Sequence, residues 1–301
     1  MRKLFLGIFL LVASQSFAAT TVTIVWPFGV GSTLLNYTRA LVHKANQDQD
    51  RYNFVIDLRP GAGGSIGAFH VVNLVGNGNL ALLASSDAFF IRPMLYPKST
   101  RYSLDDFRLI LPQVIAPMAL VSKSDEQIEN ILQKQQSNIG TTGLGTSTHV
   151  MAEQVRRRAL GMQIIPYKDP PEAVKEVMNG NIDLALETLS LALNNPKIKI
   201  HGITGKQKID GIQNLTEIGF TEMGDMDIKA MLLASRKMDV TKFKEIQTIL
   251  LKAQKDNAIL NEAIKMNRGT PIDIDPKNYD LWFQSQIRIF QTFTKPMDKL
   301  E

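Results

Sequence analysis

The sequence contains no cysteine, which excludes disulfides, thiolate metal sites and a cysteine nucleophile. Its four histidines, His43, His70, His149 and His201, show none of the spacings typical of metal ligands. After the N-terminal segment, no apolar run approaches the ~20 residues that a membrane-spanning helix requires. The chain is therefore neither a disulfide-stapled scaffold nor a multi-span membrane protein, and we expect no metal or other cofactor.

The sequence also lacks a strong excess of charge. Its formal net charge is +5, of which Arg2 and Lys3 supply two, so the rest of the chain carries +3. Such a weak surplus suits a small anion and falls well short of what nucleic-acid binding needs. With 44% hydrophobic and 21% charged residues over 301 positions, the composition is that of a globular protein large enough for two modest domains.

The N-terminus has the three parts of a secretory signal peptide. A basic pair is followed by an apolar segment at residues 4–12 and by a small-residue cleavage site, Ser16-Phe17-Ala18. We expect residues 1–18 to be removed, so that the mature chain begins at Ala19 and works in the periplasm. An uncleaved membrane anchor is the alternative, although the apolar segment is much shorter than a membrane span.

Strand and helix patterns alternate along the rest of the chain. β-branched and apolar runs predict strands, and apolar residues at helical spacing follow most of them. The strands are expected at residues 21–26, 54–58, 80–84, 139–142, 181–186 and 231–234. Such alternation predicts parallel sheets covered by helices on both faces. The last part of the chain is expected to be helical, ending in a helix that carries Trp282 and Phe293.

Three loops share one design: a strand, then small flexible residues, then the start of a helix. They lie at residues 28–32, 60–65 and 142–148. A loop of this kind presents unpaired backbone N–H groups and the positive end of a helix dipole, and glycine lets an oxyanion approach the backbone. One such loop is most simply a tight turn, but three across two strand–helix groups favour an anion-binding cleft.

Familiar enzyme motifs are incomplete in this sequence. Ile66 stands where a dinucleotide fingerprint needs its third glycine, and His149 stands where a nucleophile elbow needs its closing glycine. Gln207 interrupts the only match to the end of a P-loop. We expect His149 to hydrogen-bond at the start of a helix rather than act as a base, and residues 156–158, three arginines, to form a solvated helix face.

The second of these loops, at residues 60–65, lies in a run that resembles the signature of a known family. The run LRPGAGGSIGA at residues 58–68 is similar to the signature of the Bug family, the periplasmic solute receptors of tripartite tricarboxylate transporters. Weaker matches extend the resemblance over nearly the whole mature chain: WPF at residues 26–28 with Arg39, the stretch at residues 102–107, the hydroxyl loop at residues 140–149, IPYK at residues 165–168 and GNID at residues 180–183.

The resemblance implies a type II periplasmic-binding fold, with two α/β lobes joined by two crossover strands. Lobe one would comprise residues 19–117 and 229–301, and lobe two residues 118–228. It also implies a monomeric, non-enzymatic receptor that binds a small carboxylate and delivers it to membrane subunits of a tripartite tricarboxylate-type transporter, with no nucleic acid as partner.

Carried over by position, the resemblance implies a set of ligand-binding residues. The proximal carboxylate would lie on the first two loops, and lobe two would hold the rest of the ligand. The implied residues are Phe28, Gly29, Val30, Gly31, Ser32, Gly61, Ala62, Gly63, Gly64, Ser85, Ser86, Thr146, Ser147, Thr148, His149, Tyr167 and Glu187. The sequence departs from the family pattern at Ser32, Leu35 and Asp169, so it does not name the solute.

Two other functions stay open from the sequence. The same fold could serve a sensor protein, so that the receptor signals instead of feeding a transporter. A periplasmic hydrolase using Ser147 and His149 is the third hypothesis, and it needs a hydrogen bond between nucleophile and base together with an orienting acid. We expect Glu187, just after the strand at residues 181–186, to select among carboxylates, or else to cap the segment that starts at Leu189.

Overall fold

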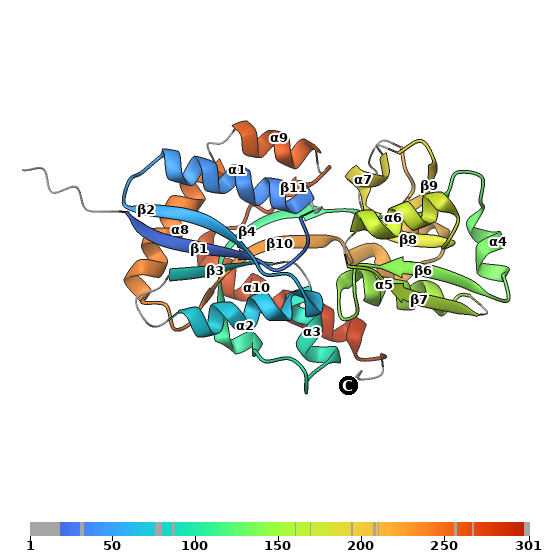
Figure 1. Ribbon diagram of the computed structural model, residues 1–301, viewed down its shortest axis with the longest axis horizontal. Helices are drawn as coiled ribbons and strands as arrows, with labels where there is room; N and C mark the ends of the chain where they lie inside the picture. The colour runs from blue at the N-terminus through green and yellow to red at the C-terminus, as the bar shows by residue number, and fades with distance from the viewer. Residues whose placement is uncertain are drawn as a thin grey trace, which may run out of the picture.

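The computed structural model describes residues 19–30, 33–75, 80–85, 88–159, 161–168, 170–193, 195–206, 209, 211–255, 258–266 and 268–297. The expected signal peptide, residues 1–18, lies outside these ranges. So do three residues of the expected binding site, Gly31, Ser32 and Ser86. The described chain forms two lobes, each built on its own β-sheet (Figure 1).

The first lobe is built on a six-stranded sheet in the order β11-β4-β10-β3-β1-β2. Its strands are β1 (Thr20–Trp26), β2 (Tyr52–Leu58), β3 (Leu80–Ser85), β4 (Phe107–Ala116), β10 (Ile228–Ser235) and β11 (Thr270–Pro271). As the alternating pattern predicted, β1 pairs in parallel with β2 and with β3. β10 runs antiparallel to β3 and β4, so the sheet is mixed, and the expected parallel pairing is limited to β1, β2 and β3.

Helices cover both faces of this sheet (Figure 1). On one face α1 (Thr33–Gln47) packs against α8 (Val240–Lys255) and α9 (Ala258–Met266). On the other face α2 (Ser65–Leu74) and α10 (Tyr279–Thr294) pack against α3 (Ala88–Leu95). Apolar side chains at helical spacing, such as Leu41 in α1 and Phe90 in α3, are fully buried against the strands, and this burial stabilises each helix on the sheet.

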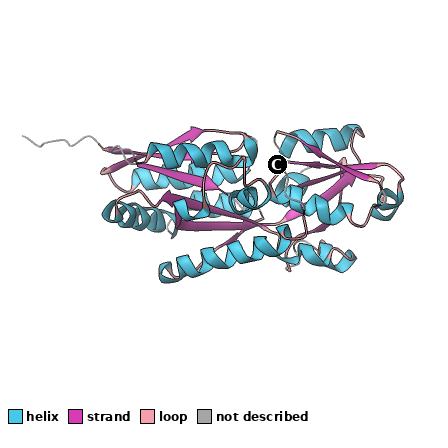
Figure 2. Cartoon of the chain, turned by 90° about the horizontal axis from the view of Figure 1, so that it is seen from below, coloured by secondary structure: helices cyan, strands magenta, loops and turns pink. Residues whose placement is uncertain are grey.

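The second lobe is built on a five-stranded sheet in the order β7-β6-β8-β5-β9. Its strands are β5 (Met118–Lys123), β6 (Ser137–Thr141), β7 (Met162–Pro166), β8 (Leu184–Thr188) and β9 (Ile198–Ile203). α6 (Pro170–Asn179) and α7 (Leu189–Leu193) pack on one face and α5 (Ser147–Arg156) on the other, while α4 (Ile128–Gln133) follows β5. Figure 2 shows helices on both sides of the strands in each lobe.

Two crossings connect the lobes. The chain leaves the first sheet at the end of β4, passes Pro117 and enters β5, and it returns from the second lobe into β10. The hydroxyl of Thr204 ties these crossings together: Met118 N–H donates to Thr204 Oγ1 (2.9 Å), which in turn donates to Asp227 Oδ1 (2.6 Å). The hinge between the lobes is therefore cross-braced by side-chain hydrogen bonds.

Two local expectations need correction. The strand expected at residues 181–186 begins only at Leu184, because Asp183 accepts hydrogen bonds from Asn138 N–H (2.9 Å) and Lys134 Nζ (2.7 Å) before the strand starts. Arg158 does not belong to a purely solvated face. Its Nη1 donates to the carbonyl of Ile218 (2.8 Å), and its guanidinium lies over the Phe220 ring.

Candidate functional site

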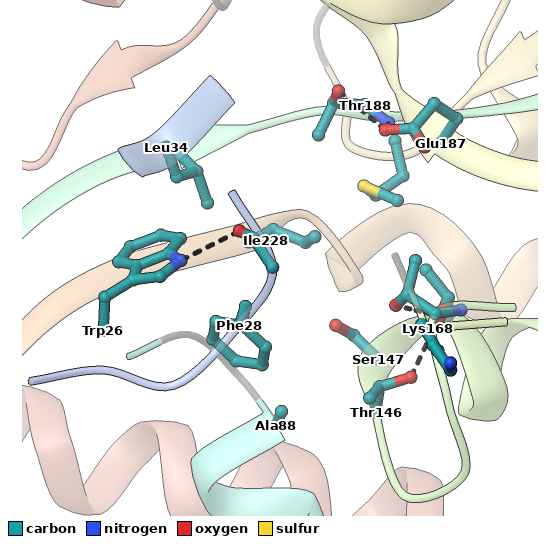
Figure 3. Close-up of a pocket in the computed structure, with 14 residues that line it drawn as sticks. Trp26, Phe28, Leu34, Ala88, Thr146, Ser147, Lys168, Glu187, Thr188 and Ile228 are labelled. Atoms are coloured by element: carbon teal, nitrogen blue, oxygen red, sulfur yellow. Dashed lines mark hydrogen bonds between the residues drawn. The ribbon is translucent and has the colours of Figure 1, made fainter. Parts of the chain in front are cut away.

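A cavity of about 70 Å³ lies between the two lobes, beside the crossing strands (Figure 3). Both lobes and both crossings contribute to its wall. Its lining residues are Trp26, Phe28, Gly29, Leu34, Ala88, Met118, Thr142, Thr146, Ser147, Thr148, Lys168, Glu187, Thr188 and Ile228. A water molecule needs ~10–15 Å³ of such space, so the cavity as it stands suits one small metabolite.

Aromatic residues at the end of β1 form the first-lobe wall. The Trp26 indole donates from Nε1 to the carbonyl of Gly29 (3.2 Å), which folds the chain back after Pro27. The Phe28 ring meets the Trp26 ring edge to face, with centroids 5.7 Å apart. This wall is largely apolar, as Figure 3 shows for Trp26, Phe28, Leu34 and Ala88.

Hydroxyl groups form much of the second-lobe wall. Thr146 caps α5, its Oγ1 accepting a hydrogen bond from His149 N–H (3.3 Å) and donating to the carbonyl of Gly143 (2.7 Å). Thr148 Oγ1 lies 2.9 Å from the hydroxyl oxygens of both Thr142 and Thr146. The N-terminus of α5 thus meets the cavity as a braced cluster of hydroxyls, with the positive end of the helix dipole behind it.

Two charged side chains of opposite sign also line the cavity. Glu187 is 1% exposed and lies inside β8, so it does not follow the strand as its position in the sequence suggested. Its Oε1 accepts hydrogen bonds from the N–H and the hydroxyl of Thr188. Lys168 follows β7, and its backbone N–H donates to Glu172 Oε2 (3.2 Å). An anionic solute would meet attraction from one of these groups and repulsion from the other.

The imidazole of His149 has a structural role, because it fixes the loop that precedes α5. Its Nδ1 accepts a hydrogen bond from Gly145 N–H (3.2 Å), as expected of a residue at a helix start, and its Nε2 lies 3.9 Å from Glu153 Oε1. Burial lowers the pKa of His149, with Glu153 opposing that shift. Between the described residues Ser147 and His149 there is no side-chain hydrogen bond, and the hydrolase hypothesis requires one.

The glycine loop between β2 and α2 has the backbone that its sequence suggests. Gly61, Ala62, Gly63 and Gly64 all have positive φ (131°, 48°, 60° and 94°), a conformation that side chains disfavour. This loop does not line the cavity. It adjoins the cavity through Phe28, because a Cβ added at Gly64 would stand 3.5 Å from the Phe28 ring.

The expected site residues divide into four groups. Six of them line the cavity: Phe28, Gly29, Thr146, Ser147, Thr148 and Glu187. Others lie nearby without lining it: Val30, Gly61, Ala62, Gly63, Gly64, His149 and Tyr167, the last packing on Gly140. Ser85 ends β3, opposite Met231 in β10. Gly31, Ser32 and Ser86 lie outside the described residues.

Sequence reasoning missed several residues of the cavity wall. These are Trp26, Leu34, Ala88, Met118, Lys168, Thr188 and Ile228, whereas Thr142 belongs to the loop at residues 142–148 that the sequence already marked as a candidate. Trp26 and Lys168 stand beside predicted site residues and could have been added from that proximity. Met118 and Ile228 belong to the crossing strands, and only the three-dimensional arrangement brings these two strands together.

A second hollow of about 280 Å³ lies on the other side of the crossing strands. Successive residues of a strand point to opposite faces. Accordingly Ile228 lines the cavity between the lobes, whereas Asp227 and Lys229 line this second hollow. Burial raises the pKa of Asp227, although its hydrogen bond from Thr204 opposes that shift. The crossing strands thus separate the cavity between the lobes from a second hollow that is lined by charged residues such as Asp227 and Lys229.

Among the described residues, no three acidic or histidine side chains gather in a way that could hold a metal ion. Within the same part of the chain, no helix combines the length and the apolar character that crossing a membrane requires.

Comparison with known protein families gives one match over most of the chain. Residues 41–291 match the family model described as the tripartite tricarboxylate transporter family receptor. A UPF0065 protein from Agrobacterium vitis is 23% identical over 288 residues, covering 88% of this chain and 82% of its own length. Another from Pseudomonas sp. (strain P51) is 24% identical over 68% of this chain, and the match spans 63% of that relative.

Solved structures show that the fold is shared. The periplasmic binding protein BugD superimposes with a TM-score of 0.82 at 19% identity, covering 93% of this chain and 98% of its own. Rpa4515 of R. palustris, solved with adipate, gives 0.80 at 18% identity over 92% of this chain and 96% of its own. MatC of Rhodopseudomonas palustris, with bound malate, gives 0.77 at 16% identity over 92% and 99%. The expected two-lobed periplasmic-binding fold is confirmed.

Proposed function

Because the chain belongs to the tripartite tricarboxylate transporter receptor family, we propose that it captures a small carboxylate between its two lobes and delivers it to a membrane transporter of that type. The observation that carries this proposal is the cavity itself, whose wall comes from both lobes and from both crossing strands. A solute in such a cavity contacts both lobes at once and so favours their closed arrangement. Malate in one structural neighbour and adipate in another support a carboxylate as the ligand class.

The second-lobe wall supplies groups that suit a carboxylate. The N-terminus of α5 carries unpaired backbone N–H groups and the positive end of its dipole, and Ser147 and Thr148 lie there against the cavity. Lys168 adds a positive charge on the same side. Charge-assisted hydrogen bonds of this kind contribute about 1.5–3 kcal/mol each, so two or three of them supply a large part of the roughly 8 kcal/mol that micromolar binding requires.

Glu187 narrows the ligand class further. A buried carboxylate beside the cavity repels a second negative charge on the ligand and favours an ammonium or hydroxyl group there. Lys168, by contrast, attracts a negative charge on the ligand. The proposed ligand is therefore an acid whose one carboxylate reaches α5 and Lys168, and whose polar substituent faces Glu187.

We place this activity in the periplasm. Removal of residues 1–18 at Ser16-Phe17-Ala18 would release a chain beginning at Ala19, and intact-mass measurement of the protein from a periplasmic extract tests this point. A mass that includes Met1 to Ala18 would contradict export by cleavage.

Delivery to a transporter is tested by uptake measurements in the native host. We expect deletion of the gene to abolish uptake of at least one radiolabelled small carboxylic acid, and the wild-type gene to restore it. Uptake that is unchanged for every acid tested would contradict a transport role. If the deletion leaves uptake intact but abolishes acid-induced gene expression, the receptor serves a sensor instead.

A further inference from the structure

A direct hydrogen bond joins the two lobes at one edge of the cavity. Arg92, in α3 of the first lobe, donates from Nη1 to the carbonyl oxygen of Leu144 (3.1 Å), which lies in the loop between β6 and α5 of the second lobe. Neither residue lines the cavity. The loop that carries Leu144 nevertheless continues at once into Thr146, Ser147 and Thr148, which do line it.

The first lobe holds the Arg92 side chain in position. Its guanidinium lies over the ring of Tyr96, with Cζ 4.1 Å from the ring centroid, and its Nη2 lies 3.5 Å from Ser99 Oγ. Tyr96 itself is 8% exposed, and its ring forms part of the first-lobe core. A guanidinium stacked in this way is already oriented, so it loses little conformational freedom when it donates to the other lobe.

Glycine makes the close approach of the lobes possible. A Cβ added at Gly145, which has a φ of +77°, would stand 3.0 Å from Arg92 Cδ and 3.0 Å from Tyr96 Cε2. On the opposite side, a Cβ at Gly63 would stand 3.1 Å from the Leu144 oxygen. Each lobe therefore contributes a glycine at a place where an added Cβ would press on the other lobe.

The same contact is connected to the wall of the cavity. Gly145 N–H donates to His149 Nδ1 (3.2 Å), and His149 N–H donates to Thr146 Oγ1, so the loop at Leu144 and the first turn of α5 form one hydrogen-bonded unit. Fixing Leu144 against Arg92 thereby fixes the hydroxyls and N–H groups of this turn relative to the first lobe.

We propose that Arg92, Tyr96, Leu144 and Gly145 form an inter-lobe latch that stabilises the closed form, and that Arg92 is a positioning residue for the ligand, which it does not touch. The inference rests on the proposed binding function for its consequence, a slower release of the ligand. The closure itself is a property of the chain without ligand and can be measured separately.

The absence of cysteine permits a direct measurement of closure. Spin labels at Asn36→Cys in α1 and Lys175→Cys in α6, two exposed positions in opposite lobes, report the distance between the lobes by electron–electron double resonance. Without any ligand, we expect Arg92→Ala to shift the distance distribution away from the short, closed distances. Gly145→Ala should produce the same shift, because its added methyl group separates the lobes.

Matched variants distinguish a latch from a general loss of structure. Arg101→Ala removes an arginine that also lies over an aromatic ring, that of Phe69, but within the first lobe, and should leave the distribution unchanged. Tyr96→Phe keeps the ring under the guanidinium and should also leave it unchanged. Each variant is compared only if its melting curve matches that of the wild type, and Arg92→Met, which keeps an unbranched chain without a donor, replaces Arg92→Ala if the latter does not fold.

A second measurement follows the consequence for binding. With malate or adipate as the probe, whichever stabilises the wild type, we expect Arg92→Ala to raise the dissociation rate roughly three- to tenfold, as for the loss of one hydrogen bond. Distance distributions that are identical for wild type, Arg92→Ala and Gly145→Ala would overturn the latch. Failure of both acids to bind would count against the proposed ligand class and leave the distance measurement on the free chain to decide the latch.

Discussion

Glu187 binds its own neighbour, Thr188, through one carboxylate oxygen. Oε1 accepts hydrogen bonds from the Thr188 N–H (2.6 Å) and from the Thr188 hydroxyl (2.9 Å), at the point where β8 ends and α7 begins. Both side chains line the cavity between the lobes. The contact has two interpretations: a carboxylate oriented to select the ligand, or a carboxylate that secures the junction between strand and helix.

Glu187→Gln separates these interpretations. If Glu187 selects the ligand, removing its charge should raise the affinity for dicarboxylates relative to amino- or hydroxyl-substituted acids, because the repulsion of a second negative charge is lost. If it only secures the junction, the variant should melt at a lower temperature and keep the wild-type order of affinities. Melting temperature and relative affinities are therefore measured on the same variant.

Lys168→Gln is the matched control in this experiment. It removes the opposite charge from the same cavity and should move the order of affinities the other way, against dicarboxylates. If neither variant changes the order of affinities, neither Glu187 nor Lys168 takes part in recognising the ligand.

Gly64→Val tests whether the glycine loop takes part in binding. Valine at a φ of +94° strains the backbone, and its side chain would pack against the Phe28 ring that lines the cavity. If an amide of this loop holds the ligand carboxylate, losing that charge-assisted hydrogen bond costs about 1.5–3 kcal/mol, and calorimetry should show the affinity reduced at least tenfold. Gly211→Val is the control, since Gly211 has a φ of +74° with nothing within 4 Å of an added Cβ. Equal affinities for the two variants would place the ligand away from this loop.

His201 predicts how stability depends on pH. Burial, with a smaller contribution from Lys199, lowers its pKa from an ordinary 6.5 to about 4. The unfolded chain then binds this proton more readily than the folded chain between pH 6.5 and pH 4, so stability falls as the pH drops through that window. The contribution is about 2 kcal/mol between pH 7 and pH 5.

Urea unfolding at several pH values measures this effect. His201→Asn removes the titrating group beside Ser122, so the loss of stability between pH 7 and pH 5 should be smaller in the variant than in the wild type. Parallel stability curves for the two proteins would show that His201 is not responsible.

Local patterns in the sequence were enough to predict much of the fold. The β-branched run that forms β1 and the glycine loop before α2 carry their own structural signals. By contrast, β10 pairs with β4, which lies more than 100 residues earlier, and no local pattern specifies such a partner. The prediction of parallel pairing therefore held for β1, β2 and β3, and it failed for β10, which returns from the other lobe and pairs antiparallel.

The candidate site was predictable to a similar extent. The hydroxyl loop at Thr146 was found because its residues are adjacent in the sequence and cap a helix. Tyr167 was predicted and Lys168 was missed, although they are neighbours. Their side chains diverge after β7, the ring of Tyr167 packing on Gly140 while Lys168 lines the cavity. A resemblance between sequences does not determine which of two adjacent residues faces a ligand.

The central claim is tested most directly by thermal unfolding of the purified chain with malate, adipate, citrate, benzoate and aspartate, each beside a neutral control such as the diamide of malate or of adipate. At a ligand concentration of one hundred times Kd, binding stabilises the folded chain by about 2.7 kcal/mol, which raises Tm by roughly 5–10 °C at this chain length. We predict such a shift for at least one acid and none for its neutral control. An unchanged Tm with every acid, or equal shifts with an acid and its amide, would contradict a carboxylate receptor.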